Sequence, residues 1–196
     1  MSFAIIKVRL WGSVANINEK LWAAAEGGHA IELEALLREP GCDALTRNNR
    51  GWTALMWAAY CGHESCVRLL LPVSDASSTD ENGLTALMRA AHEGHEACVG
   101  RLRTVSDALA RDNDGATALM RASFYGHEAC MKLLLPVSNA RAKDRSGLTA
   151  SAHAQKVGHE SLAQFIDAYI LAQSENAAIK AASKPGAPRG KAAPRV

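Results

Sequence analysis

From residue 51 to about residue 166 the apolar and polar positions recur in blocks. In each block a glycine and a threonine precede a short run of apolar and small residues, as in residues 83–92. The glycine allows a turn, the threonine hydroxyl can cap the amides that follow, and Ala, Leu and Met favour helix. Gly94 then breaks the chain, and Glu96 opens a second apolar segment that reaches Leu102. Each block therefore predicts two short helices joined by a turn.

The blocks repeat with a fixed period. The pattern Gly-x-Thr-Ala begins at residues 51, 83, 115 and 147, so the period is 32 residues, and Gly-His-Glu recurs with the same offset. Such a period indicates a solenoid, because one helical hairpin cannot bury its apolar faces alone and must stack on its neighbours. The second helix of two blocks should end before Pro72 and Pro136, since the residue before a proline is pushed out of helical geometry.

Residues 80–91, followed by Gly94 and His95, resemble the ankyrin repeat. The resemblance covers residues 48–166 in four units, and a degenerate earlier unit is legible around residues 21–37. It implies an all-α fold, an ankyrin-repeat solenoid of five stacked helical hairpins with β-hairpin-like loops. The chain departs from the family pattern in reading Thr-Ala-Leu-Met where Thr-Pro-Leu-His is usual. Each first helix should therefore begin less rigidly, because the proline that sets the first helical turn is missing.

Four segments follow from this register. Residues 1–17 form an N-terminal segment. Its apolar stretch has three possible interpretations: a short strand, a helix packed on the first unit, or an attachment segment. The repeat domain takes residues 18–170, and its fifth unit loses the Leu and Met that would face a further neighbour, which suits a terminal cap. A continued helical period predicts an extension of the last helix over residues 171–182. Residues 183–196, rich in Pro and Gly with four cations and no acid, are predicted to be a disordered basic tail.

The composition also bears on the cellular compartment of the protein and on the redox state of its cysteines. The chain has 196 residues with 22 Lys and Arg against 20 Asp and Glu, which fits one soluble domain. No stretch is long and apolar enough for a membrane span, and the N-terminal apolar stretch lacks the cleavage site of a signal peptide. Five cysteines, an odd number, argue for reduced thiols. We therefore expect a cytoplasmic protein, and a monomer is the default for a capped solenoid.

Catalytic and metal chemistry are poorly supported. His-x-x-Cys recurs at His63, His95 and His127, but neighbouring helices lie roughly 8–10 Å apart whereas two sulfurs on one zinc are at most about 4.6 Å apart. We expect these cysteines to be buried apolar residues, and the resemblance places the histidines at the turn between helices. Asp112 and Asp114 could look like a paired-carboxylate site, but the repeat explains Asp112 as the loop residue equivalent to Asp80 and Asp144. No phosphate-binding loop, dinucleotide fingerprint or nucleophile elbow is present. We predict no enzyme, no metal and no cofactor.

The binding prediction rests on where the aromatic residues fall. In a stacked array the loop tips and the outer sides of the first helices form one concave surface, the face that the resemblance also implies. Five of the ten aromatic residues occupy its outward positions, and Trp, Tyr and Arg are the residues most enriched among binding hot spots. We predict a non-catalytic scaffold that binds a protein or peptide there, through Trp52, Trp57, Tyr60, Arg89, His92, Arg121, Phe124 and Tyr125.

Two alternatives stay open. Trp57, Arg89 and Arg121 could instead pack between the first helices through their stems. The basic tail could attract nucleic-acid phosphates by a salt-sensitive attraction that ignores sequence. Residues 183–196 hold no aromatic side chain on which a base could stack, so nucleic-acid binding would be an accessory at most.

Overall fold

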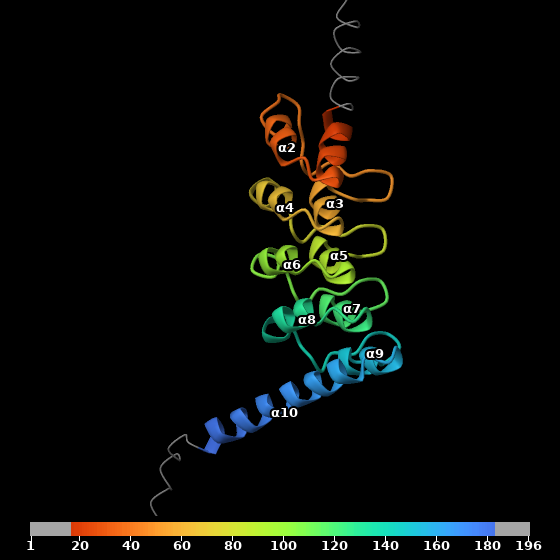
Figure 1. The fold of residues 1–196 in the computed structure, drawn as a ribbon, viewed down its shortest axis with the longest axis vertical. Helices are drawn as coiled ribbons and strands as arrows, with labels where there is room; N and C mark the ends of the chain where they lie inside the picture. The colour runs from red at the N-terminus through yellow and green to blue at the C-terminus, as the bar shows by residue number, and fades with distance from the viewer. Residues whose placement is uncertain (1–16, 183–196) are drawn as a thin grey trace, which may run out of the picture.

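A computed structural model describes residues 17–182. Residues 1–16 of the predicted N-terminal segment and the predicted basic tail, residues 183–196, lie outside the described residues. Five helical hairpins stack in one column, and no strand occurs within 17–182 (Figure 1). The first hairpin pairs a helix over residues 17–27 with α2. The labelled helices are α2 (Ala30–Leu36), α3 (Ala54–Tyr60), α4 (Glu64–Leu70), α5 (Ala86–Glu93), α6 (Glu96–Leu102), α7 (Ala118–Phe124), α8 (Glu128–Leu134), α9 (Ala150–Lys156) and α10 (Glu160–Ala182).

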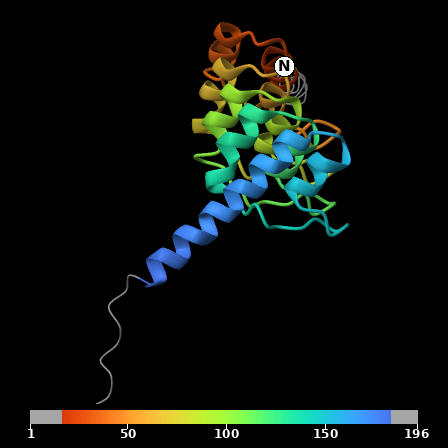
Figure 2. The ribbon, with the colours of Figure 1, turned by 60° about the horizontal axis from the view of Figure 1, so that its bottom comes forward.

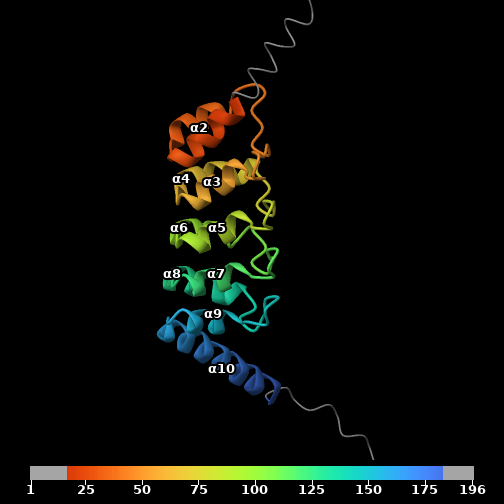
Figure 3. The ribbon, with the colours of Figure 1, turned by 90° about the vertical axis from the view of Figure 1, so that its right-hand side faces the viewer.

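The hairpins form two layers of helices. The first helices α3, α5, α7 and α9 pack in sequence on one another, and the second helices α2, α4, α6 and α8 do the same. The loops that join one hairpin to the next all project to the same side, beyond the first helices (Figure 3). We call these loops the fingers; they cover residues 37–52, 74–84, 103–116 and 138–148. The stacked-hairpin architecture predicted from the period is confirmed.

Local signals set the helix ends. The threonine before each of α3, α5, α7 and α9 is extended, and its hydroxyl accepts a hydrogen bond from the backbone N–H three residues later, as Thr85 does from Met88 at 3.3 Å. This cap satisfies an amide that has no partner within the helix. At the other end, α4 stops at Leu70 and α8 at Leu134, and each of the two prolines sits in a 3-10 turn beyond. Both helix ends agree with the sequence prediction.

The core is a ladder of equivalent residues. Leu87 and Met88 of α5 and Val99 and Leu102 of α6 are at most 1% exposed, and their equivalents in the neighbouring units are buried as well. Each unit therefore presents the same apolar face to both neighbours, and burial of that face supplies most of the stability. In the fifth unit Ser151 takes the equivalent place, where its hydroxyl donates to the carbonyl oxygen of Ala163.

The Gly-His-Glu motif joins successive units. Gly94 adopts φ +82°, in the left-handed region, and the imidazole of His127 lies against it in the space that a Cβ would take. Nε2 of His127 lies 2.8 Å from the carbonyl oxygen of His92, so the ring bridges two units. His95 and His63 repeat the arrangement one and two units earlier. The expected place of the histidines at the turn is confirmed, and the second-helix cysteines are fully buried, as predicted.

The last helix continues past the stack. α10 is 23 residues long, packs on α9 with its first half and then leaves the column (Figure 2). Ile166 is fully buried, whereas Leu171 and Ile179 farther along are exposed. Over the described residues, no helix combines the length and the apolar character that crossing a membrane requires.

Candidate functional site

Each finger folds around one carboxylate or amide side chain. Oδ1 of Asp80 accepts hydrogen bonds of 2.9 Å from the backbone N–H groups of Asn82 and Leu84, which closes the turn at the finger tip. Asn48, Asp112 and Asp144 have the same role in the other fingers. Backbone bonds also link neighbouring tips, since Asn113 N–H donates to the Asn82 carbonyl at 3.0 Å and Arg145 N–H to that of Asp114 at 2.9 Å. The tips are therefore held in register.

The second carboxylate oxygen ties the finger to the first helix. Oδ2 of Asp80 binds the guanidinium of Arg89, and Oδ2 of Asp112 binds that of Arg121. The two carboxylates are fully buried, and the arginine side chains are only 13% and 19% exposed. In the fifth unit His153 takes the place of the arginine, with Nε2 2.7 Å from Oδ2 of Asp144. The charges of Arg89 and Arg121 are therefore used within the protein. The packing alternative placed the stems of these arginines between the first helices and did not include the carboxylate partners.

Three predicted aromatic residues of the second unit form a cluster with a fourth predicted residue, Arg89 of α5 in the third unit. The ring centroid of Trp52 lies 4.5 Å from that of Trp57 and 5.2 Å from that of Tyr60, and the guanidinium carbon of Arg89 stands 4.1 Å from the Trp52 ring. Trp52 is only 7% exposed, so the prediction that it faces outward is wrong. Its position follows the glycine of the finger tip, and the equivalent Leu84 also turns into the core. Trp57 and Tyr60 are half-buried and supply the accessible edge of the cluster.

The other four predicted residues gather near the fourth unit. The rings of His92 and Tyr125 are stacked with centroids 4.1 Å apart, and Phe124 meets Tyr125 edge-on at 5.0 Å. Burial lowers the pKa of His92; Glu93 opposes this shift, and Arg121 reinforces it. The imidazole is therefore uncharged at neutral pH. Tyr125 is 43% exposed, which makes it the most accessible of the eight predicted side chains.

A recess of about 350 Å³ lies beside this second cluster. The α7 residues Met120, Arg121 and Phe124, together with Tyr125 directly after the helix, form one side, and the next finger and α9 form the other. The remaining lining residues are Asp114, Ala116, Asp144, Arg145, Ser146 and His153. Three of the predicted contact residues thus share one concavity between the fourth and fifth units.

The finger carboxylates and His153 were not among the predicted contact residues. A signal for them exists in the sequence, because an acid and a basic residue stand nine positions apart in three successive units: Asp80 and Arg89, Asp112 and Arg121, Asp144 and His153. The nine positions span a finger tip and the first turns of a helix. The spacing therefore indicates an acid–base contact only when the fold of the finger is known.

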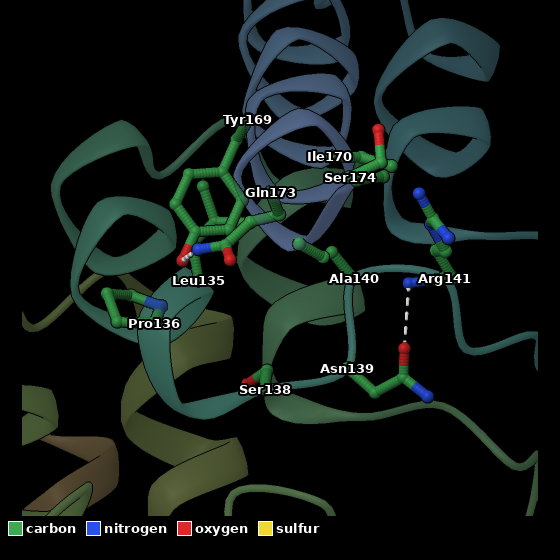
Figure 4. Close-up of a pocket in the computed structure, with 11 residues that line it drawn as sticks. Leu135, Pro136, Ser138, Asn139, Ala140, Arg141, Tyr169, Ile170, Gln173 and Ser174 are labelled. Carbon is green, nitrogen blue, oxygen red and sulfur yellow. Dashed lines mark hydrogen bonds between the residues drawn. The ribbon is translucent and has the colours of Figure 1, made fainter. Parts of the chain in front are cut away.

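A second recess, of about 370 Å³, lies where α10 leaves the stack (Figure 4). Tyr169, Gln173 and Ser174 of α10 face Pro136 and the start of the last finger across it. Its polar groups are partly used, since Gln173 Nε2 donates to the Tyr169 hydroxyl at 3.0 Å. None of the eight predicted residues lines it.

The side chains that could bind metal are dispersed. Within residues 17–182 no three His, Cys, Asp or Glu side chains gather as a metal site. Burial raises the pKa of Cys98 and Cys130 to about 11, so both thiols stay protonated at neutral pH. A protonated and fully buried thiol is a poor ligand and a poor nucleophile.

The fold and its finger-bearing face define a helical repeat solenoid. Residues 21–105 match the family described as Ankyrin repeats (3 copies), and residues 114–145 match the family described as Ankyrin repeat. The chain belongs to the ankyrin-repeat family, which confirms the resemblance seen in the sequence. No curated protein matches the chain. Ankyrin repeats are generally protein–protein interaction modules, and the family is typically non-catalytic.

Proposed function

We propose that the protein is a non-catalytic cytoplasmic interaction module that holds a protein or peptide on its finger face. This face is made of the finger tips, residues 47–50, 79–82, 111–114 and 143–146, and the outward positions of α3, α5, α7 and α9. The observation that carries the proposal is the recess beside Tyr125, which combines an exposed aromatic side chain with a concave surface. Exposed aromatic residues in such places commonly dominate binding energy.

The size of the recess indicates what it can accept. About 350 Å³ is at the lower end of the range for ligand pockets, so it suits one large side chain of a partner. Met120 and Phe124 supply apolar surface, and Tyr125 adds an aromatic wall that ends in a hydroxyl. A protein or peptide that inserts one side chain here can continue along the neighbouring finger tips.

The same recess offers little to catalysis. Nε2 of His153 is bonded to Asp144, and Nδ1 is buried and has no hydrogen-bond partner among residues 17–182. Neither nitrogen is therefore placed to take a proton from a bound substrate. The carboxylate of Asp144 is likewise bonded to His153 and to the backbone of its own finger. These bonds support a structural role for both groups.

The decisive test compares two exposed aromatic residues. Tyr125→Ala removes the wall of the recess, and Phe165→Ala on α10, where Phe165 is 44% exposed, removes a similar area elsewhere. Affinity capture from nuclease-treated lysate, read by mass spectrometry, should lose its partner with Tyr125→Ala alone; loss of a hot spot costs at least about thirtyfold in affinity. Circular dichroism confirms that both variants are folded.

Deleting residues 183–196 tests the nucleic-acid alternative in the same experiment. If the partner is lost with this deletion or with nuclease treatment, and is kept by Tyr125→Ala, the finger face is not the binding site. A partner that both aromatic variants capture equally well contradicts the proposal too.

A further inference from the structure

Charge is unevenly distributed over the described residues. Residues 17–182 carry 16 Lys and Arg against 20 Asp and Glu, a formal net charge of −4. The finger face of units two to five carries eight cations and six acids, hence a net charge of +2, which leaves −6 for the rest. The cations are Arg47, Arg50, Arg89, Arg111, Arg121, Lys143, Arg145 and Lys156. The acids are Asp80, Glu81, Glu93, Asp112, Asp114 and Asp144.

The buried ion pairs leave this total unchanged and show which charges a partner meets. Asp80 and Asp112 are fully buried, and each is neutralised by its arginine. Asp144 is bonded to His153 and is almost entirely buried. Asp80, Asp112 and their arginines therefore cancel, which leaves six cations against Glu81, Glu93, Asp114 and Asp144, again a net charge of +2.

The cations concentrate beside the recess. The guanidinium of Arg111 donates to the carbonyl oxygens of Gly115 and Lys143 at 2.9 and 2.6 Å, so it spans the tips of the last two fingers. Arg145 lines the recess itself, and its side chain and that of Lys143 are exposed. Against these three cations the same tips carry the exposed carboxylate of Asp114 and the largely buried carboxylate of Asp144, both of which line the recess.

We infer that the partner is an acidic peptide segment, with a bulky apolar side chain in the recess and carboxylates facing Arg111, Lys143 and Arg145. The inference rests on the proposed function and adds the chemistry of the partner. An exposed ion pair is worth only about 0–1 kcal/mol, so the recess supplies the affinity. The charges supply orientation and a faster association, because Arg111, Lys143 and Arg145 are exposed beside the recess and attract a negatively charged chain to it.

A random library of twelve-residue peptides displayed on phage tests the inference on the full chain. Enriched sequences should contain more Asp and Glu than Lys and Arg, together with one large apolar residue. Arg145→Glu should weaken enriched peptides by about tenfold, because it places like charges opposite each other. Arg68→Glu is the matched control, since Arg68 is an exposed cation on α4 in the second layer of helices; it should leave affinity unchanged.

The possible outcomes distinguish failure of the acidic-peptide inference from failure of the proposed function. Peptides that require Tyr125 but carry no acidic excess overturn the inference and leave the proposed function standing. The absence of enriched peptides, or enrichment that survives Tyr125→Ala, overturns both. If a single-stranded oligonucleotide of random sequence displaces the peptides at about 0.15 M salt, the cations serve phosphate instead and the inference fails.

Discussion

His153 holds Asp144 at 2.7 Å in the fifth unit, at the place where arginine holds the equivalent aspartate in the third and fourth units. An arginine is charged at every accessible pH, whereas histidine is the side chain whose charge changes nearest to neutrality. The finger that borders the recess is thus tied to its helix by a carboxylate–imidazole pair, and the two preceding fingers are tied by carboxylate–guanidinium pairs.

Acid should loosen the fifth finger through Asp144. Burial alone would raise the pKa of its carboxyl, but hydrogen bonds from Leu148 N–H and from His153 outweigh burial and lower it. A carboxyl with a lowered folded-state pKa contributes stability that is present above its unfolded value, about 3.9, and is lost as pH falls below it. As pH falls from about 5 to about 2.5, the unfolding free energy of Asp144→Asn should therefore decrease less than that of the wild type.

Urea unfolding at several pH values measures this difference. Asp167→Asn on α10 is the control, because Asp167 is exposed; its unfolding free energy should follow that of the wild type. Equal acid sensitivity of Asp144→Asn and the wild type would show that the bonds to Asp144 contribute nothing.

The buried pair of Asp112 and Arg121 should couple strongly. Arg121→Met leaves the buried carboxylate without its cation and should lower the unfolding free energy by about 2–3 kcal/mol, since the arginine is partly exposed. Adding Asp112→Asn removes the stranded charge, so the double variant should be more stable than Arg121→Met. Denaturant unfolding of both variants gives the coupling energy. Arg68→Met, at an exposed position, should change stability little, and an additive double variant would contradict the pairing.

Alanine substitutions at two glycines distinguish the cost of backbone strain from the cost of a steric clash. Gly94 and Gly158 have φ of +82° and +85°, so alanine at either should cost about 1–2 kcal/mol. A Cβ at Gly94 would collide with the ring of His127, whereas nothing lies within 4 Å of one at Gly158. Gly94→Ala should therefore lower Tm more, because it also displaces His127 from its bond to the preceding unit. Equal Tm losses would mean that the histidine bridge contributes no stability.

The five cysteines should fall into two reactivity classes. Cys66, Cys98 and Cys130 are fully buried, and burial raises their pKa values, whereas Cys42 and Cys61 are half-buried. Iodoacetamide on the folded protein at about pH 8 should modify Cys42 and Cys61 first, although burial raises their pKa values too. Peptide mass spectrometry identifies the sites. Early modification of Cys98 would show that the second helices open locally.

The sequence alone determined the helices and their stacking. Thr85 caps a helix, Gly94 turns the chain and Pro72 ends a helix through interactions with residues only a few positions away, so these signals can be read from the chain. The 32-residue period then multiplied one hairpin into a column, because equivalent apolar faces can be buried only against each other. The candidate face followed from the same register.

Only the tertiary structure decided which side chains of that face a partner can reach. Trp52 and Tyr125 were both expected to point outward. Tyr125 is exposed, whereas Trp52 is buried beneath Arg89. Arg121 was expected to be available to a partner, yet it binds Asp112 across the finger. These outcomes depend on how a finger folds over its own helix and against the next unit. Such contacts join residues nine and about thirty-two positions apart, beyond the range of local backbone preferences.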